Sequence, residues 1–248
     1  MFRKQDLVVV EKDKRGMRMA RSLVEERARE GQDALLEPPI AVQRSKLGYR
    51  FVKRIFDIVC SGLALLVLSP LLLVIAVLIK LEDGGPIIHA RLCVGAKKEY
   101  RMYKFRSMVP DADNLQKYFT EEQLKQYLKE VKLDHDPRVT RIGKILRKTS
   151  LDELPQLLDV FKGDMSLVGP RPLVEEELCY YGGQARRFLF AKPGITGYWQ
   201  VNGRSDSTYE SGKRQLLELY YVDHSSVWLD IKILFQTVMV VLKGVGAK

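Results

Sequence analysis

The chain has 248 residues, of which 46% are hydrophobic and 29% are charged, so it can bury a core and is not disordered throughout. Its formal net charge of +10 favours an anionic partner such as acidic lipid, a phosphorylated substrate or nucleic acid. The three cysteines and three histidines are scattered and form neither a CxxC pair nor an HExxH motif, which argues against cysteine- or histidine-based metal sites.

Residues 1–48 form a charged N-terminal extension to which the sequence assigns no chemistry. The next segment, residues 49–82, is predicted to be a membrane helix. Residues 58–79 within it contain no charged side chain, and as a helix they would be about 33 Å long, enough to cross a hydrocarbon core. A straight transmembrane anchor is therefore one interpretation.

Ser69 and Pro70 lie in the middle of the apolar run and favour a second interpretation, a re-entrant helix that enters and leaves the membrane on one face. Proline frees the backbone carbonyl one turn earlier, and the Ser69 hydroxyl can donate a hydrogen bond to it, so that a break is tolerated in lipid. Both flanks of the run are basic, which draws both toward the cytoplasm. We therefore expect the re-entrant form.

Residues 83–248 are expected to form one domain on the cytoplasmic face, with an α+β, mainly helical fold. Its predicted elements are a small β-hairpin at residues 87–93 and 99–106, a helix with many opposite charges at 112–132, and a basic helix at 140–148. Residues 228–242 are apolar but contain Asp230, Lys232 and Gln236. They are expected to lie in the membrane interface as an amphipathic helix, with a core helix as the alternative.

Two adjacent carboxylates follow the basic helix. Ser150 and Glu153 have the spacing of a capping box, which predicts that Ser150 caps a helix over residues 151–161 with Asp152 and Glu153 in its first turn. Such a pair, next to Arg147, can hold Mg²⁺ and a phosphate together, and a carboxylate can also attack phosphorus directly. The structural alternative is that Glu153 only completes the cap.

Two stretches rich in glycine and proline, residues 163–172 and 192–204, contain Arg171 and Arg204. Each offers backbone N–H groups and an arginine to a diphosphate, although tight turns alone explain the composition. Neither a GxGxxG motif after a strand nor a Walker A loop is present, so Rossmann or P-loop nucleotide binding has no support.

Several motifs, in this order, resemble the bacterial sugar transferase family, the monotopic phosphoglycosyl transferases that begin polysaccharide and glycoconjugate assembly. They are KRIFD at 53–57 leading into the run with Ser69-Pro70, KFRSM at 104–108, RKTSLDELPQ at 147–156, GPRP at 169–172 and KPGITG at 192–197. The resemblance covers residues 49–248. It implies a monotopic protein of the bacterial inner membrane, with residues 83–248 as a catalytic domain on the cytoplasmic face.

The resemblance also implies a reaction. A sugar 1-phosphate would pass from a UDP-sugar, commonly UDP-glucose or UDP-galactose, to undecaprenyl phosphate with release of UMP, initiating exopolysaccharide, capsule or glycoconjugate synthesis. Carried over by residue, the roles are Asp152 as the nucleophile that forms a phosphosugar intermediate, Glu153 as the Mg²⁺ ligand, Arg147, Arg171, Arg204, Lys104 and Arg106 as substrate-binding groups, Glu218 as an acid near the metal, and Ser69 and Pro70 as the helix break.

Two other functions compete with this one. A catalytically inactive membrane scaffold of the same fold requires a degraded site, yet all the residues above are present. A nucleic-acid-binding protein requires a reading module or a basic stripe with stacking aromatics, and the sequence has neither. The sugar is left open, and a homodimer through the extension or the interfacial helices is compatible with the sequence.

Overall fold

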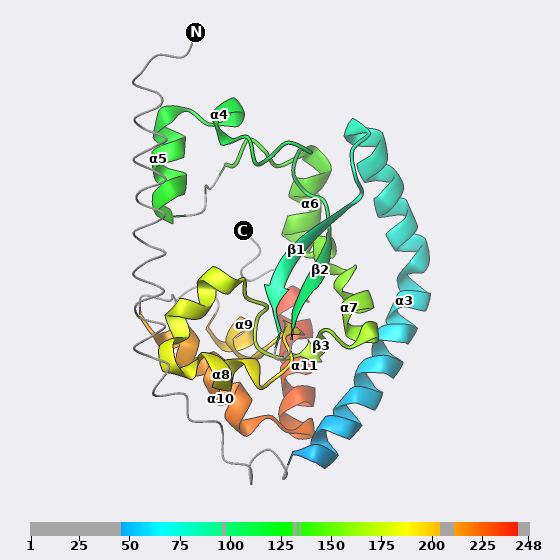
Figure 1. The fold of residues 1–248 in the computed structure, drawn as a ribbon. Helices are drawn as coiled ribbons and strands as arrows, with labels where there is room; N and C mark the ends of the chain where they lie inside the picture. Colours follow the sequence, from blue (N-terminus) through cyan, green and yellow to red (C-terminus); the bar gives the residue numbers. More distant parts are fainter. Residues whose placement is uncertain (1–45, 96–97, 131–132, 134, 204–210, 243–248) are drawn as a thin grey trace.

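The computed structural model describes residues 46–95, 98–130, 133, 135–203 and 211–242 (Figure 1). This part of the chain is mainly helical and contains two two-stranded sheets, so the α+β, mainly helical prediction is confirmed. The predicted N-terminal extension lies almost entirely outside the described residues.

The first described element, α3 (Leu47–Asp83), is a helix of 37 residues with Pro70 inside it. Ser69 Oγ donates a hydrogen bond of 2.8 Å to the Leu66 carbonyl, the group from which proline removes the helical donor. The predicted local repair of the backbone is therefore confirmed. Within the described residues, α3 is the one helix long and apolar enough to cross a membrane, and Figure 1 shows that it is bowed.

The N-terminal half of α3 is tied to the rest of the protein by polar contacts. The Arg54 guanidinium donates to the Val160 and Phe161 carbonyls at 2.7 and 2.8 Å. The buried Asp57 Oδ1 accepts hydrogen bonds of 3.0 Å from Ser166 Oγ and from the Leu167 N–H. The KRIFD motif at the start of the apolar run thus docks the helix onto the globular body.

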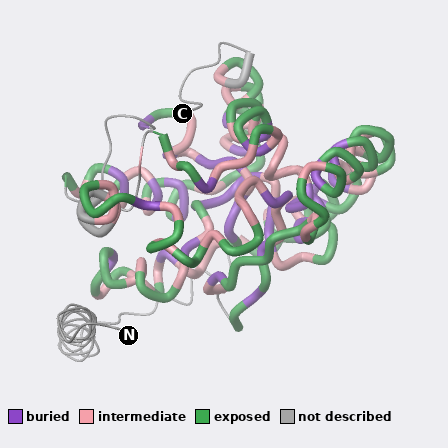
Figure 2. The backbone as a smooth tube through the Cα atoms, turned by 90° about the horizontal axis from the view of Figure 1, so that it is seen from above, coloured by how far each residue is buried: buried purple, intermediate pink, exposed green. Residues whose placement is uncertain are grey.

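The C-terminal half of α3 docks onto the same body through apolar contacts. Ile75 and Ile79 are buried in one cluster with Phe105 and Leu146. Between the two docked halves the helix is open to solvent, with Leu66 74% and Val67 69% exposed, and most of the helix is coloured as exposed in Figure 2. The two ends of α3 are therefore held by one folded unit, while the outward face of its middle presents apolar side chains to solvent.

The predicted hairpin is confirmed, because β1 (Ile88–Val94) pairs antiparallel with β2 (Glu99–Phe105). The second sheet joins β3 (Ser166–Val168) and β4 (Gly194–Thr196) in parallel. A Cβ atom on Gly194 would lie 2.1 Å from the Gly169 nitrogen, so this close approach requires glycine. The two glycine- and proline-rich stretches are consequently neighbours in space.

The helices that follow the hairpin are, in chain order, α4 (Leu115–Tyr118), α5 (Glu121–Glu130), α6 (Arg141–Thr149), η1 (Leu151–Glu153), α7 (Gln156–Lys162), η2 (Glu175–Gln184), α8 (Ala185–Leu189), α9 (Tyr198–Asn202), α10 (Lys213–His224) and α11 (Val227–Leu242). The helix predicted at residues 112–132 is thus two helices, because Phe119 has extended backbone after α4. The basic helix is confirmed as α6, with the Thr140 side chain as its N-cap.

The last helix, α11, combines the two alternatives predicted for it. Ile233 is fully buried in the core and Asp230 is 6% exposed, whereas Trp228 and Phe235 are 77% and 69% exposed. One face of α11 therefore belongs to the core, and the other presents large apolar side chains outward, as an interfacial helix would.

Candidate active site

The Asp152–Glu153 pair lies on η1, a short turn between α6 and α7. The predicted capping box is wrong: Ser150 makes no side-chain cap, and its backbone has φ 57 and ψ 19. An N-cap residue is typically extended, but Ser150 instead closes α6, with its N–H pointing back at the last turn. Pro155 then precedes α7, at a position that tolerates a missing N–H.

Ser150 is the only non-glycine residue with positive φ in the described ranges. The left-handed conformation costs a side-chain-bearing residue about 1–2 kcal/mol, and such strain persists where the surrounding structure enforces it, often at functional sites. The strained turn therefore ends α6 just before the two carboxylates. Asp152 and Glu153 consequently lie on η1, outside both α6 and α7.

A polar cavity of about 320 Å³ opens beside this turn. Ser150 and Glu153 line it on one side, and three cationic side chains, Arg91, Lys104 and Arg171, also line it. Arg91 belongs to β1 and Lys104 to β2, while Arg171 follows β3. A cavity with this lining is suited to a diphosphate, because guanidinium and ammonium groups neutralise phosphate oxygens.

The charges around Asp152 have opposing effects on it. Burial raises the pKa of Asp152, and the nearby Glu153 carboxylate raises it as well, whereas Lys104 and Arg147 lower it. Lys104 Nζ lies 2.6 Å from Glu153 Oε1. Arg147 Nε donates to Ser107 Oγ at 2.9 Å, and burial lowers the pKa of Arg147. Lys104 and Arg147 are thus the cations that favour an ionised Asp152.

Behind Arg171 lies a second polar cluster. The Arg171 N–H donates to Glu218 Oε2 at 3.0 Å, and the Arg214 Nε lies 3.9 Å from Glu218 Oε1. The Arg214 and Arg171 guanidinium carbons lie 4.2 and 5.9 Å from the centroid of the Trp199 ring. Burial raises the pKa of Glu218 to about 7. This cluster fixes the backbone of Arg171 at the cavity wall.

An apolar cavity of about 170 Å³ adjoins the polar one. Ser150 and Glu153 line both. Leu154 and Leu157 also line the apolar cavity, and so does Val240 on α11, the helix with the exposed apolar face. The carboxylate turn therefore stands between a cationic cavity and an apolar one.

Of the predicted site residues, Lys104, Glu153 and Arg171 line the polar cavity. Asp152 and Arg147 line neither the polar nor the apolar cavity, but the charges of Lys104, Glu153 and Arg147 all act on Asp152. Arg204 lies outside the described residues. Glu218 does not line the cavity, and its described contacts are with Arg171 and Arg214. Ser69 and Pro70 lie on α3.

Arg106 does not line the cavity either. Its guanidinium pairs with both Asp83 carboxylate oxygens, and it also donates to the Met108 carbonyl at 2.8 Å and to the Pro86 carbonyl. The side chain is only 7% exposed. Arg106 thus holds the end of α3 against the hairpin, which is a structural role.

Arg91 and Gln156 line the cavity but carry no expectation from the sequence. The hairpin register offers a signal for Arg91, because Arg91 pairs with Met102, two residues from Lys104. Side chains two residues apart in a strand lie on one face, so Met102 and Lys104 share a face with Arg91. The hairpin predicted at residues 87–93 and 99–106 therefore already brings Arg91 near Lys104. For Gln156 the signal is its place at the end of the RKTSLDELPQ motif.

The described residues offer few candidate ligands for a metal ion. No group of three His, Cys, Asp or Glu side chains able to hold a metal occurs among the described residues. Asp152 and Glu153 nevertheless offer hard oxygen atoms, and Mg²⁺ in proteins commonly takes one or two carboxylates and completes its shell with water and substrate phosphates. The pair beside a cationic cavity therefore fits Mg²⁺ bound together with a phosphate substrate.

Comparison with known proteins agrees with this geometry. The chain is 46% identical over 207 residues to an undecaprenyl-phosphate galactose phosphotransferase of Salmonella typhimurium, covering 82% of this chain and 43% of that protein. It is 40% identical over 199 residues to the exopolysaccharide production protein ExoY of Rhizobium meliloti, covering 79% of this chain and 87% of that protein.

A third relative, an N-acetylgalactosaminephosphotransferase of Aeromonas hydrophila that uses UDP-N-acetylgalactosamine and undecaprenyl phosphate by its name, is 37% identical over 205 residues, covering 81% of this chain and 46% of that protein. The chain thus spans less than half the length of the Salmonella and Aeromonas relatives. The profile of the family described as bacterial sugar transferase matches residues 48–244. The chain belongs to the bacterial sugar transferase family.

Proposed function

We propose that this protein transfers a sugar 1-phosphate from a UDP-sugar to undecaprenyl phosphate, and that Asp152 forms a covalent phosphosugar intermediate. The observation that carries the proposal is the position of the Asp152–Glu153 turn between a cationic cavity and an apolar cavity. This arrangement suits the transfer of a phosphoryl group from a nucleotide to a lipid phosphate, because the cationic cavity favours the donor diphosphate and the apolar cavity favours the lipid chain. The family and the names of the relatives support the same reaction.

In the proposed first step, a carboxylate oxygen of Asp152 attacks the sugar-bearing phosphorus of the donor. The bond from that phosphorus to the bridging oxygen breaks, and UMP leaves with the bonding electrons. Lys104 and Arg171 neutralise the phosphate oxygens, a role that dominates in phosphoryl transfer. In the second step, a phosphate oxygen of undecaprenyl phosphate attacks the same phosphorus, Asp152 is released, and the lipid diphosphate sugar forms.

Two further roles belong to the proposal. Asp152 must be ionised to attack, and Lys104 and Arg147 favour that state against the effect of burial. Glu153 would hold Mg²⁺ together with a donor phosphate, and Mg²⁺ supplies charge neutralisation for the diphosphate there. We take UDP-galactose and UDP-glucose as the first donors to test, since the Salmonella relative is named for galactose.

We further propose that α3 is re-entrant, with both ends on the cytoplasmic face of the inner membrane. The support is the docking of both halves of α3 onto one folded body, Asp57 at one end and Ile79 at the other. A straight span would place these ends on opposite sides of about 30 Å of hydrocarbon, with one globular unit in contact with both. Ser69 provides the donor that makes a break there tolerable in lipid.

The reaction is tested with purified full-length protein, undecaprenyl phosphate, Mg²⁺ and a panel of UDP-sugars, with released UMP as the readout. Asp152→Asn is expected to abolish UMP release and to remove the sugar-phosphate adduct that mass spectrometry detects when the lipid is omitted. Asp113→Asn, at an exposed aspartate outside both cavities, is the matched control and keeps both signals. Near-normal turnover by Asp152→Asn would refute the covalent mechanism, and a wild-type protein without turnover on any donor would favour the scaffold.

The topology is tested separately by labelling with a membrane-impermeant maleimide. Single cysteines are placed at Gly48, where an added Cβ meets nothing within 4 Å, and at the exposed Lys98, in a protein whose native cysteines are replaced by serine. The re-entrant form predicts that neither site reacts in intact spheroplasts and that both react after lysis. If only one of the two sites reacts in intact spheroplasts, α3 crosses the membrane as a straight span.

A further inference from the structure

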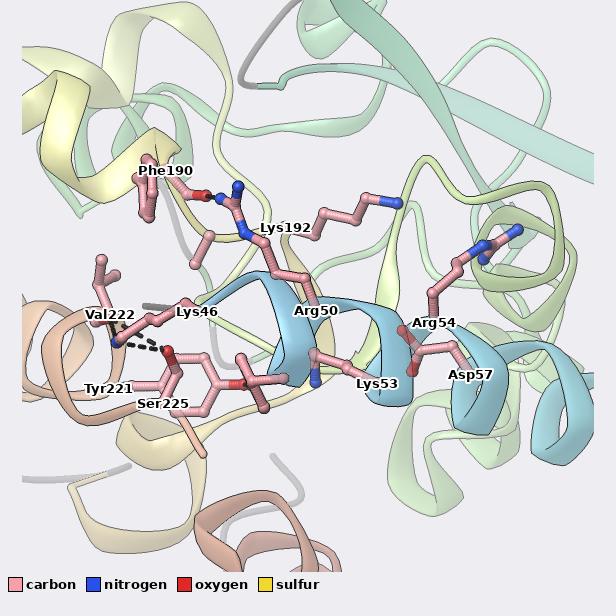
Figure 3. A pocket seen from close by; sticks show the side chains of 12 residues that line it. Lys46, Arg50, Lys53, Arg54, Asp57, Phe190, Lys192, Tyr221, Val222 and Ser225 are labelled. Carbon is pink, nitrogen blue, oxygen red and sulfur yellow. Dashed lines mark hydrogen bonds between the residues drawn. The ribbon is translucent and has the colours of Figure 1, made fainter. Parts of the chain in front are cut away.

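A third cavity, of about 110 Å³, lies at the N-terminal end of α3 (Figure 3). We refer to it as the basal cavity. None of the residues that line it lines the polar or the apolar cavity beside Asp152. Its charged lining consists of five cations and one carboxylate, namely Lys46, Arg50, Lys53, Arg54, Lys192 and Asp57. The basal cavity is thus a second, strongly positive site on the molecule.

The charges of this lining are only partly neutralised within the described structure. Lys53 pairs with Asp230 at 2.7 Å, and the Asp57 carboxylate, whose Oδ1 accepts from two neutral donors of β3, offsets the charge of one more cation. Arg50 and Arg54 donate to carbonyl oxygens, which satisfy hydrogen bonds but do not cancel a full charge. A net positive charge therefore remains on the wall of the basal cavity.

Lys192 is the clearest case. Its side chain is exposed at the mouth of the basal cavity, and it forms no hydrogen bond or ion pair with any residue in the described part of the chain. Figure 3 shows it extended across the space between the Arg50 and Arg54 side chains. Burial lowers the pKa of Lys192, and the nearby Arg54 lowers it further. Asp57 and Asp164 act in the opposite direction. An anion bound between the Lys192 ammonium and the guanidinium groups of Arg50 and Arg54 would offset the repulsion among these cations.

The position of the basal cavity indicates where the anion comes from. On the same turns of α3, the side chains that face away from the cavity are apolar, with Phe51 69% and Ile55 48% exposed. Trp228, on α11, is 77% exposed, and tryptophan is enriched where membrane meets water. The cavity therefore lies at the depth of lipid headgroups if α3 enters the membrane as proposed above.

We propose that the basal cavity binds the phosphate of an anionic membrane phospholipid, held by Lys192, Arg50 and Arg54. The ligand chemistry is a phosphate ester, and the apolar turns beside the cavity favour one that is attached to acyl chains. The site is separate from the reaction at Asp152, and this inference rests on the proposed membrane placement of α3 but not on the covalent mechanism. It gives the protein a lipid contact that anchors the start of the membrane helix.

The experiment measures lipid binding without turnover. Full-length protein in a neutral detergent is titrated with short-chain phosphatidylglycerol, with the matching phosphatidylcholine and with inorganic phosphate, and the thermal midpoint is followed. Phosphatidylglycerol is expected to raise the midpoint of the wild type, and native mass spectrometry is expected to show one retained molecule. Lys192→Gln is expected to bind phosphatidylglycerol about tenfold more weakly or worse, since a charge-assisted hydrogen bond contributes on that order.

Three variants serve as controls. Lys192→Arg keeps the charge and should keep the binding, and Lys232→Gln removes one exposed charge from α11 and should bind as the wild type does. Asp152→Asn should also bind normally, which separates a failure of this inference from a failure of the proposed reaction. Without lipid, Lys192→Gln should be about as stable as the wild type, because Lys192 is exposed and forms no hydrogen bond or ion pair with a described residue.

Equal phosphatidylglycerol binding by the wild type and Lys192→Gln would overturn the proposal. Equal binding of phosphatidylglycerol and phosphatidylcholine would overturn it as well, because the anionic charge would then be irrelevant. If inorganic phosphate binds as tightly as the lipid, the basal cavity is a site for a free anion and the lipid assignment is wrong.

Discussion

The buried carboxylate of Glu218 makes the stability of the protein depend on pH in a direction that can be tested. Glu218 is only 2% exposed, and burial raises its pKa from 4.5 to about 7. Between these two pH values the unfolded chain has released its proton while the folded protein still holds it. The free energy of unfolding therefore falls as the pH rises from 4.5 through about 7.

The size of the effect follows from the pKa difference. One pKa unit corresponds to about 1.36 kcal/mol, so ionising Glu218 in the folded protein costs about 3 kcal/mol of stability. Glu218→Gln removes this cost, and its amide oxygen can still accept the hydrogen bond from the Arg171 N–H. We therefore expect Glu218→Gln to be more stable than the wild type by about 3 kcal/mol at pH 8 and to differ little at pH 4.5.

The assay is the thermal midpoint followed by intrinsic tryptophan fluorescence, since Trp199 packs on this cluster. For a folded unit of this size 1 kcal/mol shifts the midpoint by about 2–4 °C, so the expected gain at pH 8 is about 6–12 °C. EDTA is added so that no metal contributes. Glu175→Gln, at an exposed glutamate, is the control and should change little. A Glu218→Gln protein that is less stable than the wild type at pH 8 would show that the ionised carboxylate is stabilised in the fold, and would refute the reasoning.

The other predictions concern the helix dock, the close packing and the catalytic charges. Asp57→Ala leaves two donors of β3 without their buried acceptor and should lower the free energy of unfolding by about 3 kcal/mol, measured by denaturant titration; no loss would contradict the docking role. Gly143→Ala places a Cβ 2.0 Å from the Ser107 carbonyl oxygen and should cost about 1–3 kcal/mol in the same measurement, so a neutral result would contradict the packing. Lys104→Gln should lower kcat/KM about tenfold. It should also move the acid limb of the pH profile to higher pH, because Lys104 lowers the pKa of Asp152. An unmoved acid limb would show that Asp152 is not the group that titrates.

Local chemistry determined a large part of this protein from its sequence. The hydrogen bond from Ser69 to the Leu66 carbonyl involves residues within one helical turn, and the hairpin strands are separated by a short turn. The basic helix α6 and its Thr140 cap are local as well. Such features depend on propensity and spacing, which the sequence states directly. The family motifs around Asp152 likewise indicated the family correctly.

The tertiary structure decided what depends on contacts between distant segments. Ser150 has the residue type and spacing of an N-cap, but in the fold its backbone is left-handed and its N–H closes the preceding helix. Arg106 belongs to the same motif as Lys104, but its guanidinium pairs with Asp83, 23 residues away, and not with the cavity. Arg171 is held by Glu218 across 47 residues.

The basal cavity is also a product of the tertiary structure, since it joins the start of α3 to Lys192, far along the chain. The motif KRIFD looked like a membrane flank in the sequence, whereas in the fold it docks α3 through Arg54 and Asp57. Spacing along a chain fixes which groups are neighbours within a helix or a hairpin. Which charges meet across the fold depends on packing that no local pattern encodes.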